Sequence, residues 1–269
     1  MRKKLVVITI GCAGLLTAAF LLLKSDYSTF LTWWLAVLVI GLAFFPLTSC
    51  LFRSFSDRGW IFSKVFGIAA GGYLMFALCA AGAAPFNAVM CIVCVIIAAV
   101  VCMIVSLLLT RKKAVTSGET APEISFELIL FEEFLFILLF LIWAYFTGFK
   151  PEALSTEKFM DYGLLASMER SLDLPAKDMW YGLSAINYYY GGQYLTVYLS
   201  KFCYLSVRVT YNLMRAAEAA FAFCLPFSLV YHMVRSRLRE RTHAAAWSYA
   251  GGILGGTAVS LAGNVQIGR

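Results

Sequence analysis

Charged side chains are scarce in this chain. Only 14% of its 269 residues are Asp, Glu, Lys or Arg, whereas 61% are hydrophobic and the mean hydropathy is +0.80. A soluble domain of this length does not need so much apolar surface to build its core. The composition therefore excludes a soluble globular protein and predicts an integral membrane protein.

Long apolar runs account for most of the chain. A helix needs ~20 residues to cross the ~30 Å hydrocarbon layer. We predict an all-α, polytopic membrane helix bundle of about seven to eight spans, with one exterior loop that bears short amphipathic helices. Two runs, 188–206 and 244–262, are weaker than the rest. The stronger runs are Leu5–Leu23, Phe30–Phe52, Val65–Ala84, Phe86–Leu109, Phe126–Phe146 and Leu213–Tyr231.

The first run lacks a small-residue cleavage site at its end, where Lys24 and Ser25 stand instead. It therefore reads as a retained span and not as a cleaved signal peptide. The basic clusters Arg2–Lys4, Arg53–Lys64 and Arg111–Lys113 fall on one side if every intervening run crosses. In membrane proteins, cytoplasmic loops carry an excess of Lys and Arg. We therefore predict that the side with these basic clusters is cytoplasmic.

This orientation predicts a multi-pass protein of the cell membrane with a cytoplasmic N-terminus and an exterior loop at 147–187. The net charge of +7 is then a signal of topology, and no nucleic-acid partner is expected. If both 188–206 and Leu213–Tyr231 cross the membrane, the basic stretch Arg235–Arg241 lies outside the cell, which conflicts with the excess of Lys and Arg expected in cytoplasmic loops. Either 188–206 is a re-entrant or interfacial segment, or local packing overrides the charge bias.

Three blocks are expected along the chain. Residues 1–110 form an N-terminal four-helix membrane unit, and 111–125 form a polar cytoplasmic linker. Residues 126–269 form a second membrane unit that contains the exterior loop. No polar tail follows the last apolar run, so this second unit is expected to be incomplete at its C-terminus.

The exterior loop contains no cysteine. All eight cysteines lie in apolar runs, which argues against a disulfide framework and predicts free thiols. Cys91 and Cys94 have the spacing of a metal or redox pair, but they lack a second pair of ligands and lie inside an expected span. Core packing is the better interpretation.

The exterior loop is the one long polar stretch, and it contains a predicted helix from Thr156 to Leu172, with Ser155 or Thr156 as its N-cap. At 100° per residue, Glu157 and Asp161 fall in the middle of an apolar arc. Carboxylates in such a setting need a metal ion, a substrate hydroxyl or a basic residue as partner. The alternative is a pair of acids that reach water at the interface. The apolar arc consists of Met160, Leu164, Leu165, Met168 and Leu172.

Asn187 and the tyrosines 188–190 lead into the next apolar run. Tyrosines at such a boundary commonly form an aromatic belt. Three successive helical residues point about 100° apart, so at least one ring should face protein or a cavity. There its hydroxyl can bond a ligand and its ring can stack on a sugar. Asp178, in the connector before this motif, is a further candidate ligand.

Three glutamates stand near the start of the Phe126–Phe146 run. Glu127 can cap that helix through its dipole. Glu132 and Glu133 lie about one turn deeper and are expected to face the bundle. There they would hydrogen-bond to neighbouring helices.

The polar motifs resemble those of a family of large uncharacterised membrane proteins named for a Tyr-Tyr-Tyr motif. The matching segments are Glu157–Asp161, Asp178–Gly182 and Asn187–Gly191. Phe159 and Met179 stand where that family usually has proline. Members of the family are much longer, so the resemblance implies that this chain is an N-terminal portion.

That family is distantly similar to the GT-C membrane glycosyltransferases, which take sugars from lipid-phosphate donors. The likeness implies transfer of a sugar from a polyprenyl phosphate to an exterior acceptor, in contact with membrane lipid. Glu157 and Asp161 would be catalytic, and Asp161 could hold a divalent cation. A non-catalytic transporter or scaffold is the alternative. The implied substrate-binding residues are Lys158, Arg170, Asp178, Asn187, Tyr188, Tyr189 and Tyr190.

Overall fold

A computed structural model describes residues 2–116, 123–238 and 241–261, and for residues 2, 3, 112–116 and 156 it describes the backbone alone. Within these ranges the chain is helical, apart from loops and a single isolated bridge between Lys177 and Ala185. The predicted all-α class is confirmed. The prediction that the second membrane unit is incomplete at its C-terminus concerns residues 263–269, which lie outside the described residues.

The helices follow one another with short connections, except for the long loop 171–190 between α6 and α7. They are α1 (Arg2–Leu23), the 3₁₀ helix η1 (Lys24–Asp26), α2 (Tyr27–Leu51), α3 (Trp60–Ala80), α4 (Ala88–Thr116), α5 (Phe126–Thr147), α6 (Thr156–Arg170), α7 (Gly191–Phe202), α8 (Val207–Arg237) and α9 (Ala244–Ser260). Helix α4 continues to Thr116, so the polar linker predicted at 111–125 begins later than expected. Part of it, 117–122, is outside the described residues.

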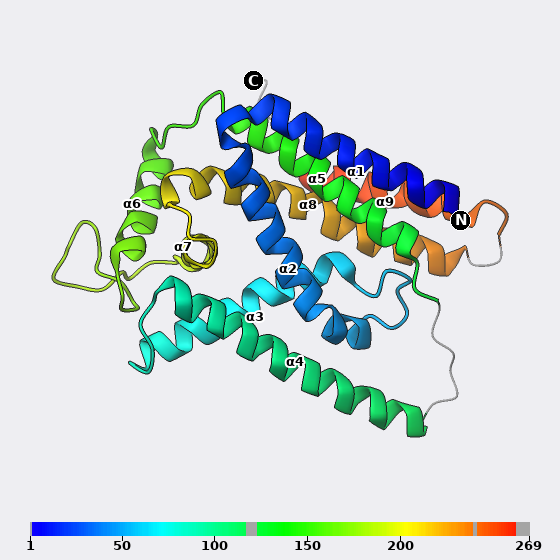
Figure 1. The fold of residues 1–269 in the computed structure, drawn as a ribbon, viewed down its shortest axis with the longest axis horizontal. Coiled ribbons are helices and arrows are strands. Elements are labelled where there is room, and N and C mark those ends of the chain that lie inside the picture. The colour runs from blue at the N-terminus through cyan, green and yellow to red at the C-terminus, as the bar shows by residue number, and fades with distance from the viewer. Residues whose placement is uncertain (1, 117–122, 239–240, 262–269) are drawn as a thin grey trace.

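Five stretches of the described chain are long and apolar enough to cross a membrane. The first, Lys4–Leu51, contains both α1 and α2, which fold back on each other at η1 (Figure 1). The other four coincide with α3, α4, α5 and α8. Helix α7, with 12 residues, is only about 18 Å long, well short of the ~30 Å layer.

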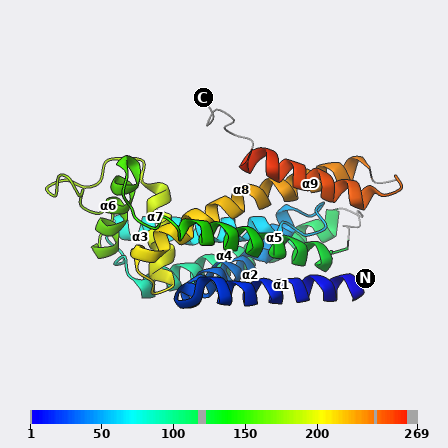
Figure 2. The ribbon, with the colours of Figure 1, turned by 90° about the horizontal axis from the view of Figure 1, so that it is seen from above.

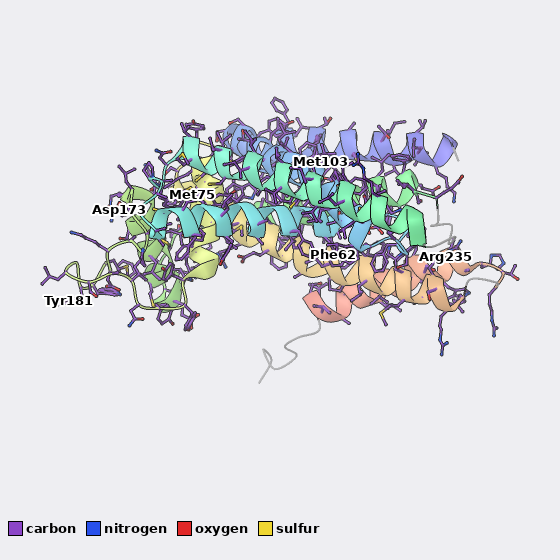
Figure 3. The ribbon with its side chains drawn as sticks, turned by 90° about the horizontal axis from the view of Figure 1, so that it is seen from below. Phe62, Met75, Met103, Asp173, Tyr181 and Arg235 are labelled. Carbon is purple, nitrogen blue, oxygen red and sulfur yellow. The ribbon has the colours of Figure 1, made fainter. Side chains whose placement is uncertain are left out.

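The loops divide between two opposite ends of the bundle. Figure 3 places Asp173 and Tyr181 at one end and Arg235 at the other. We call the first, with residues 147–190, the loop end. The second, where α1 begins and where α4 and α8 end, is the basic end (Figure 1).

The position of α7 decides the conflict over Arg235–Arg241. Both of its termini lie at the loop end, because Gln193 bonds to Asp161 of α6 and Val207, just beyond α7, bonds to Glu169 of α6. Helix α7 therefore does not cross. Helix α8 then returns to the basic end, and Arg235 and Arg237 lie with the other basic residues.

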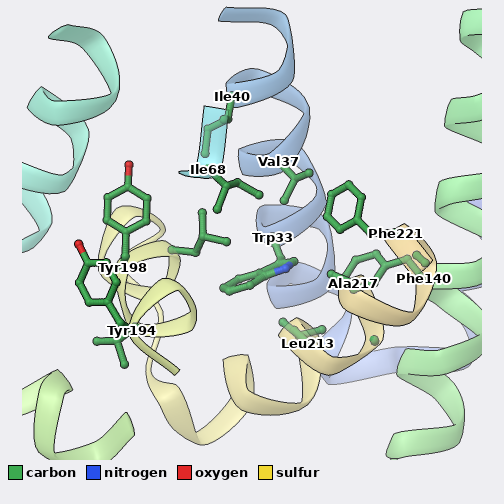
Figure 4. Packing of buried hydrophobic residues seen from close by; sticks show 14 of the residues in the cluster. Trp33, Val37, Ile40, Ile68, Phe140, Tyr194, Tyr198, Leu213, Ala217 and Phe221 are labelled. Atoms are coloured by element: carbon green, nitrogen blue, oxygen red, sulfur yellow. The ribbon is translucent and has the colours of Figure 1, made fainter. Parts of the chain in front are cut away.

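Close contact with α3 holds α7 inside the bundle. The Tyr194 hydroxyl donates a hydrogen bond of 2.7 Å to the Gly72 carbonyl. A Cβ atom on Gly72 would lie 2.6 Å from Cδ2 of Leu195, so a larger residue there would force the Leu195 side chain to move. Figure 4 shows Tyr194 and Tyr198 of α7 among the buried residues of the core, to which Trp33 of α2 also belongs.

Elements from both expected units share this core. Helix α1 packs along α5, and α3 contacts α5, α7 and α8. Helix α9 lies beside α8 on one face of the molecule (Figure 2), where Gly252 and Gly256 pack on Phe227 and Phe223. Small residues let two helices approach closely where no hydrophobic effect drives them together in lipid.

All eight cysteines are free, as predicted. Cys91 and Cys94 are fully buried in the core. No cluster of three or more His, Cys, Asp or Glu side chains that could hold a metal ion exists among the described residues. The core-packing interpretation of Cys91 and Cys94 therefore agrees with the structure.

Candidate functional site

Helix α6 lies across the loop end and packs one face on the bundle. Leu164, Leu165 and Met168 are buried, as the predicted arc requires. The helix ends at Arg170, because Ser171 adopts an extended backbone, so Leu172 is exposed instead of joining the arc. Ser155 stands at the N-cap position, but its side chain makes no capping hydrogen bond.

The two candidate acids of α6 differ in their surroundings. Asp161 is half-buried, and its Oδ1 accepts a hydrogen bond of 2.8 Å from Gln193 Nε2 of α7. Glu157, one turn earlier, is exposed. The expectation that both acids sit on a buried face is therefore wrong for Glu157. The fully buried residues of α6 begin about two turns later, at Leu164, so the first turn of the helix stands clear of the core.

A polar pocket opens where α6, α7 and α8 meet. Its volume is about 230 Å³. Glu218 interacts electrostatically with Arg215 and Asp161 across this space. The pocket thus combines two acids, one base and an amide within a small volume. Its lining residues are Asp161, Leu165, Gly192, Gln193, Thr196, Tyr211, Met214, Arg215 and Glu218.

Arg215 is the cation of the pocket. Its guanidinium lies 5.5 Å from the centre of the Tyr211 ring, in a cation–π contact. Within the described ranges, no carboxylate forms a salt bridge with it. An arginine held on an aromatic ring, with its donors uncommitted to an acid, is suited to bind a phosphate.

The tyrosine motif precedes α7 and is not helical, contrary to the expectation for residues 188–190. Tyr188 and Tyr189 stack with ring centres 3.9 Å apart, and Tyr188 donates a hydrogen bond of 2.5 Å to the Tyr189 hydroxyl. That bond raises the pKa of the Tyr188 phenol, and the charges of Glu157 and Asp161 act in the same direction. The stacked pair therefore stands near both acids.

Only one of the three tyrosines faces protein. Tyr190 is half-buried against the core, whereas Tyr188 and Tyr189 are 42% and 80% exposed. The prediction that at least one ring faces protein is confirmed. The exposed pair presents an aromatic surface at the loop end, and Asn187 beside it is also exposed.

The structure does not bring all predicted site residues together. The Asp178 Oδ1 accepts hydrogen bonds from the backbone N–H groups of Trp180 and Tyr181, so it closes its own turn. Arg170 is exposed in the last turn of α6, nine residues and about 13 Å of helix from Asp161. Lys158 is half-buried beside Glu157.

Two charged side chains tie the elements of the site in place. The Lys201 ammonium donates to the carbonyls of Phe86 and Ser171 at 2.7 and 3.0 Å, and burial lowers its pKa. The Glu169 Oε1 accepts from the Val207 N–H at 2.9 Å and so caps α8. These bonds fix α6 relative to α7 and α8.

Three pocket residues, Gln193, Arg215 and Glu218, were absent from the predicted site. A signal for two of them was present in the sequence. Arg215 and Glu218 are three residues apart inside an otherwise apolar run, and ionisable residues inside a span usually serve function. Gln193 carried no such signal, because a polar residue at a helix start is ordinary.

Comparison with known proteins places the chain in one family. The family described as "Uncharacterized membrane protein (DUF2298)" matches residues 71–268, which include the whole pocket. No curated protein and no solved structure matches the chain.

Proposed function

We propose that this chain, which belongs to the uncharacterised membrane-protein family DUF2298, is a GT-C-like glycosyltransferase. It would move a sugar from a polyprenyl-phosphate donor to an acceptor hydroxyl at the loop end. The observation that supports this proposal most is the shared pocket of Asp161 and Arg215 at the end of a membrane bundle. A carboxylate and an arginine side by side match a hydroxyl nucleophile and a phosphate leaving group.

Each group has a role in this transfer. The Asp161 carboxylate accepts the proton of the acceptor hydroxyl while that oxygen forms its bond to the anomeric carbon. The bond from this carbon to the donor phosphate breaks, and the phosphate leaves with the bonding electron pair. Arg215 stabilises the phosphate charge, the role that was expected for Lys158 or Arg170.

The surroundings supply the remaining contacts. The stacked rings of Tyr188 and Tyr189 offer a flat aromatic surface to a sugar. The Gln193 amide orients the Asp161 carboxylate. Lys158 and Glu157, about one helical turn before Asp161 on α6, would contribute charge near the acceptor. A divalent cation on Asp161 remains a prediction from the resemblance.

The first test is Asp161→Asn in the full-length protein. Loss of the general base should lower sugar transfer from a radiolabelled polyprenyl-phosphate pool by roughly 10² or more. Thermal stability in detergent should stay at the wild-type value or rise slightly, because the variant removes a half-buried charge. Glu152→Gln, in the exposed loop outside the pocket, is the matched control and should keep full transfer.

Full transfer by Asp161→Asn and Glu157→Gln alike would refute the catalytic assignment. No transfer by the wild-type protein from any polyprenyl-phosphate pool would refute glycosyl transfer itself. Lower stability with unchanged specific activity would make the acids structural. That last result would favour the other function class, a non-catalytic transporter or scaffold.

A further inference from the structure

A second group of ionisable side chains is buried at the basic end, far from the pocket. It comprises Asp57 from the loop before α3, Lys64 of α3, Glu132 and Glu133 of α5, and His232 of α8. None of the five is more than 7% exposed. Burying so many ionisable groups is costly unless each has a partner.

Lys64 and Glu133 form a buried ion pair. The Lys64 ammonium lies 2.6 Å from Glu133 Oε2. The indole N–H of Trp60 also donates to Oε2, and that of Trp34 donates to Oε1, at 3.0 and 2.8 Å. This ion pair is therefore fully hydrogen-bonded, as predicted for Glu133, and its charges cancel.

Asp57 also has a full set of donors. Its carboxylate pairs with the His232 Nε2 and accepts a 3.0 Å bond from the Trp60 backbone N–H. The Ser228 hydroxyl donates to it at 3.4 Å. Arg58, the next residue in the same loop, interacts electrostatically with Asp57 and donates a hydrogen bond to the Arg53 carbonyl.

Glu132 is different. Its side chain is 0% exposed, and neither carboxylate oxygen has a hydrogen-bond partner within the described ranges. It lies beside Asp57 and Ser228, and the nearest cation, Lys64, is already bonded to Glu133. The other ionisable groups that face it are Cys224 and Tyr231 of α8 and Tyr249 of α9, none of which is a base. Ser228 of α8 and Asp57 lie close enough to Glu132 for a polar contact, but among the described residues the hydrogen bond predicted between helices does not reach normal geometry.

We propose that Glu132 is a buried proton-binding site that exchanges its proton with water at the basic end through Asp57 and His232. At neutral pH the site is occupied, and Glu132 is an uncharged carboxylic acid. In the uptake step a proton from water reaches the His232 ring, the Nε2–H proton passes to Asp57, and Asp57 passes a proton to Glu132. The net result is that one proton moves from water to Glu132, and His232, which gains a proton at Nδ1 and loses the one at Nε2, is left as its Nδ1–H tautomer.

A proton fits this site better than a metal ion. The oxygens of Asp57 are already engaged by three donors, which leaves Glu132 as the one carboxylate able to accept a new ligand. No cluster of metal-ligating side chains is present in the described part of the chain. A proton needs a single oxygen and removes the charge whose burial is costly. Acids placed in this way inside membrane proteins commonly relay protons.

Infrared spectroscopy of the full-length protein in lipid tests the proposal. At neutral pH the wild-type protein should show the C=O stretching band of a protonated carboxylic acid. The band should shift when glutamate carboxyl groups carry ¹³C. It should disappear in Glu132→Gln and remain in Glu127→Gln, the control, whose residue pairs with Lys4 at the surface.

The wild-type spectrum decides the matter even if a variant does not fold. Absence of a protonated-carboxyl band at neutral pH would overturn the proposal, as would a band that survives in Glu132→Gln or, should that variant misfold, in Glu132→Leu. The route is tested by hydrogen–deuterium exchange of the same band. Exchange should slow at least tenfold in His232→Gln, and an unchanged rate would overturn the route through His232.

Discussion

The two ends of this bundle handle their ionisable side chains in opposite ways. At the loop end, Asp161 is half-buried and Glu157 exposed, beside a pocket that Arg215 also lines. At the basic end, Asp57, Lys64 and Glu132 are fully buried. Groups that keep contact with water can exchange ligands at little cost, whereas fully buried groups must be paired or neutral. The loop end is therefore suited to bind a substrate, and the basic end to hold charges or a proton inside the bundle.

The largest expected effect concerns which end faces outward. In a background without cysteine, Ser184→Cys at the exposed loop end should react with a membrane-impermeant thiol reagent in intact cells. Arg235→Cys at the basic end should react only after lysis, because the positive-inside rule places that end in the cytoplasm. The reverse labelling pattern would refute the orientation and, with it, the exterior location of the pocket.

The next effect tests the buried charge pair. Lys64→Met should lower the free energy of unfolding by about 3–5 kcal/mol, because it leaves the Glu133 charge buried and unpaired. The control is Lys4→Met, which removes the 3.4 Å pair between exposed Lys4 and Glu127 and should cost about 0–1 kcal/mol. Unfolding in detergent by denaturant measures both. Equal costs would show that water reaches Lys64.

The smallest effect compares buried Lys64 at the basic end with half-buried Lys201 at the loop end. Lys201 donates to two carbonyls and forms no salt bridge with an acid in the described part of the chain, so Lys201→Met leaves unpaired acceptors but no unpaired charge. The expected cost is about 1–3 kcal/mol, less than for Lys64→Met. A cost equal to that of Lys64→Met would remove the distinction between the ends.

The pH dependence offers a second measurement on Lys201. Burial lowers its pKa in the folded protein, so the unfolded chain binds more protons between that pKa and the ordinary lysine value of about 10.4. Wild-type stability should therefore rise with pH across this window, and Lys201→Met should lose that rise. An identical pH dependence in the two proteins would contradict burial of the ammonium.

Apolar runs predicted the long helices well where the helix does not continue into polar sequence beyond the run. The run Phe126–Phe146 differs from α5 by one residue. The run Leu213–Tyr231 is much shorter than α8, because Arg208 and Arg235 lie within the helix and end the apolar pattern early. Charges do not break a helix, so apolarity alone underestimates helix length wherever polar residues continue it.

The sequence by itself determined that this is a helical membrane protein, that its cysteines are free, and that its polar residues gather in one loop. Tertiary structure alone decided that α7 turns back without crossing, that Gln193 and Arg215 join Asp161, and that Glu132 is buried without a base as partner among the described residues. The physical reason is that hydropathy and helical period describe one segment at a time. A pocket or an ion pair depends on which other helix covers a given face, and here those helices are far apart in the chain.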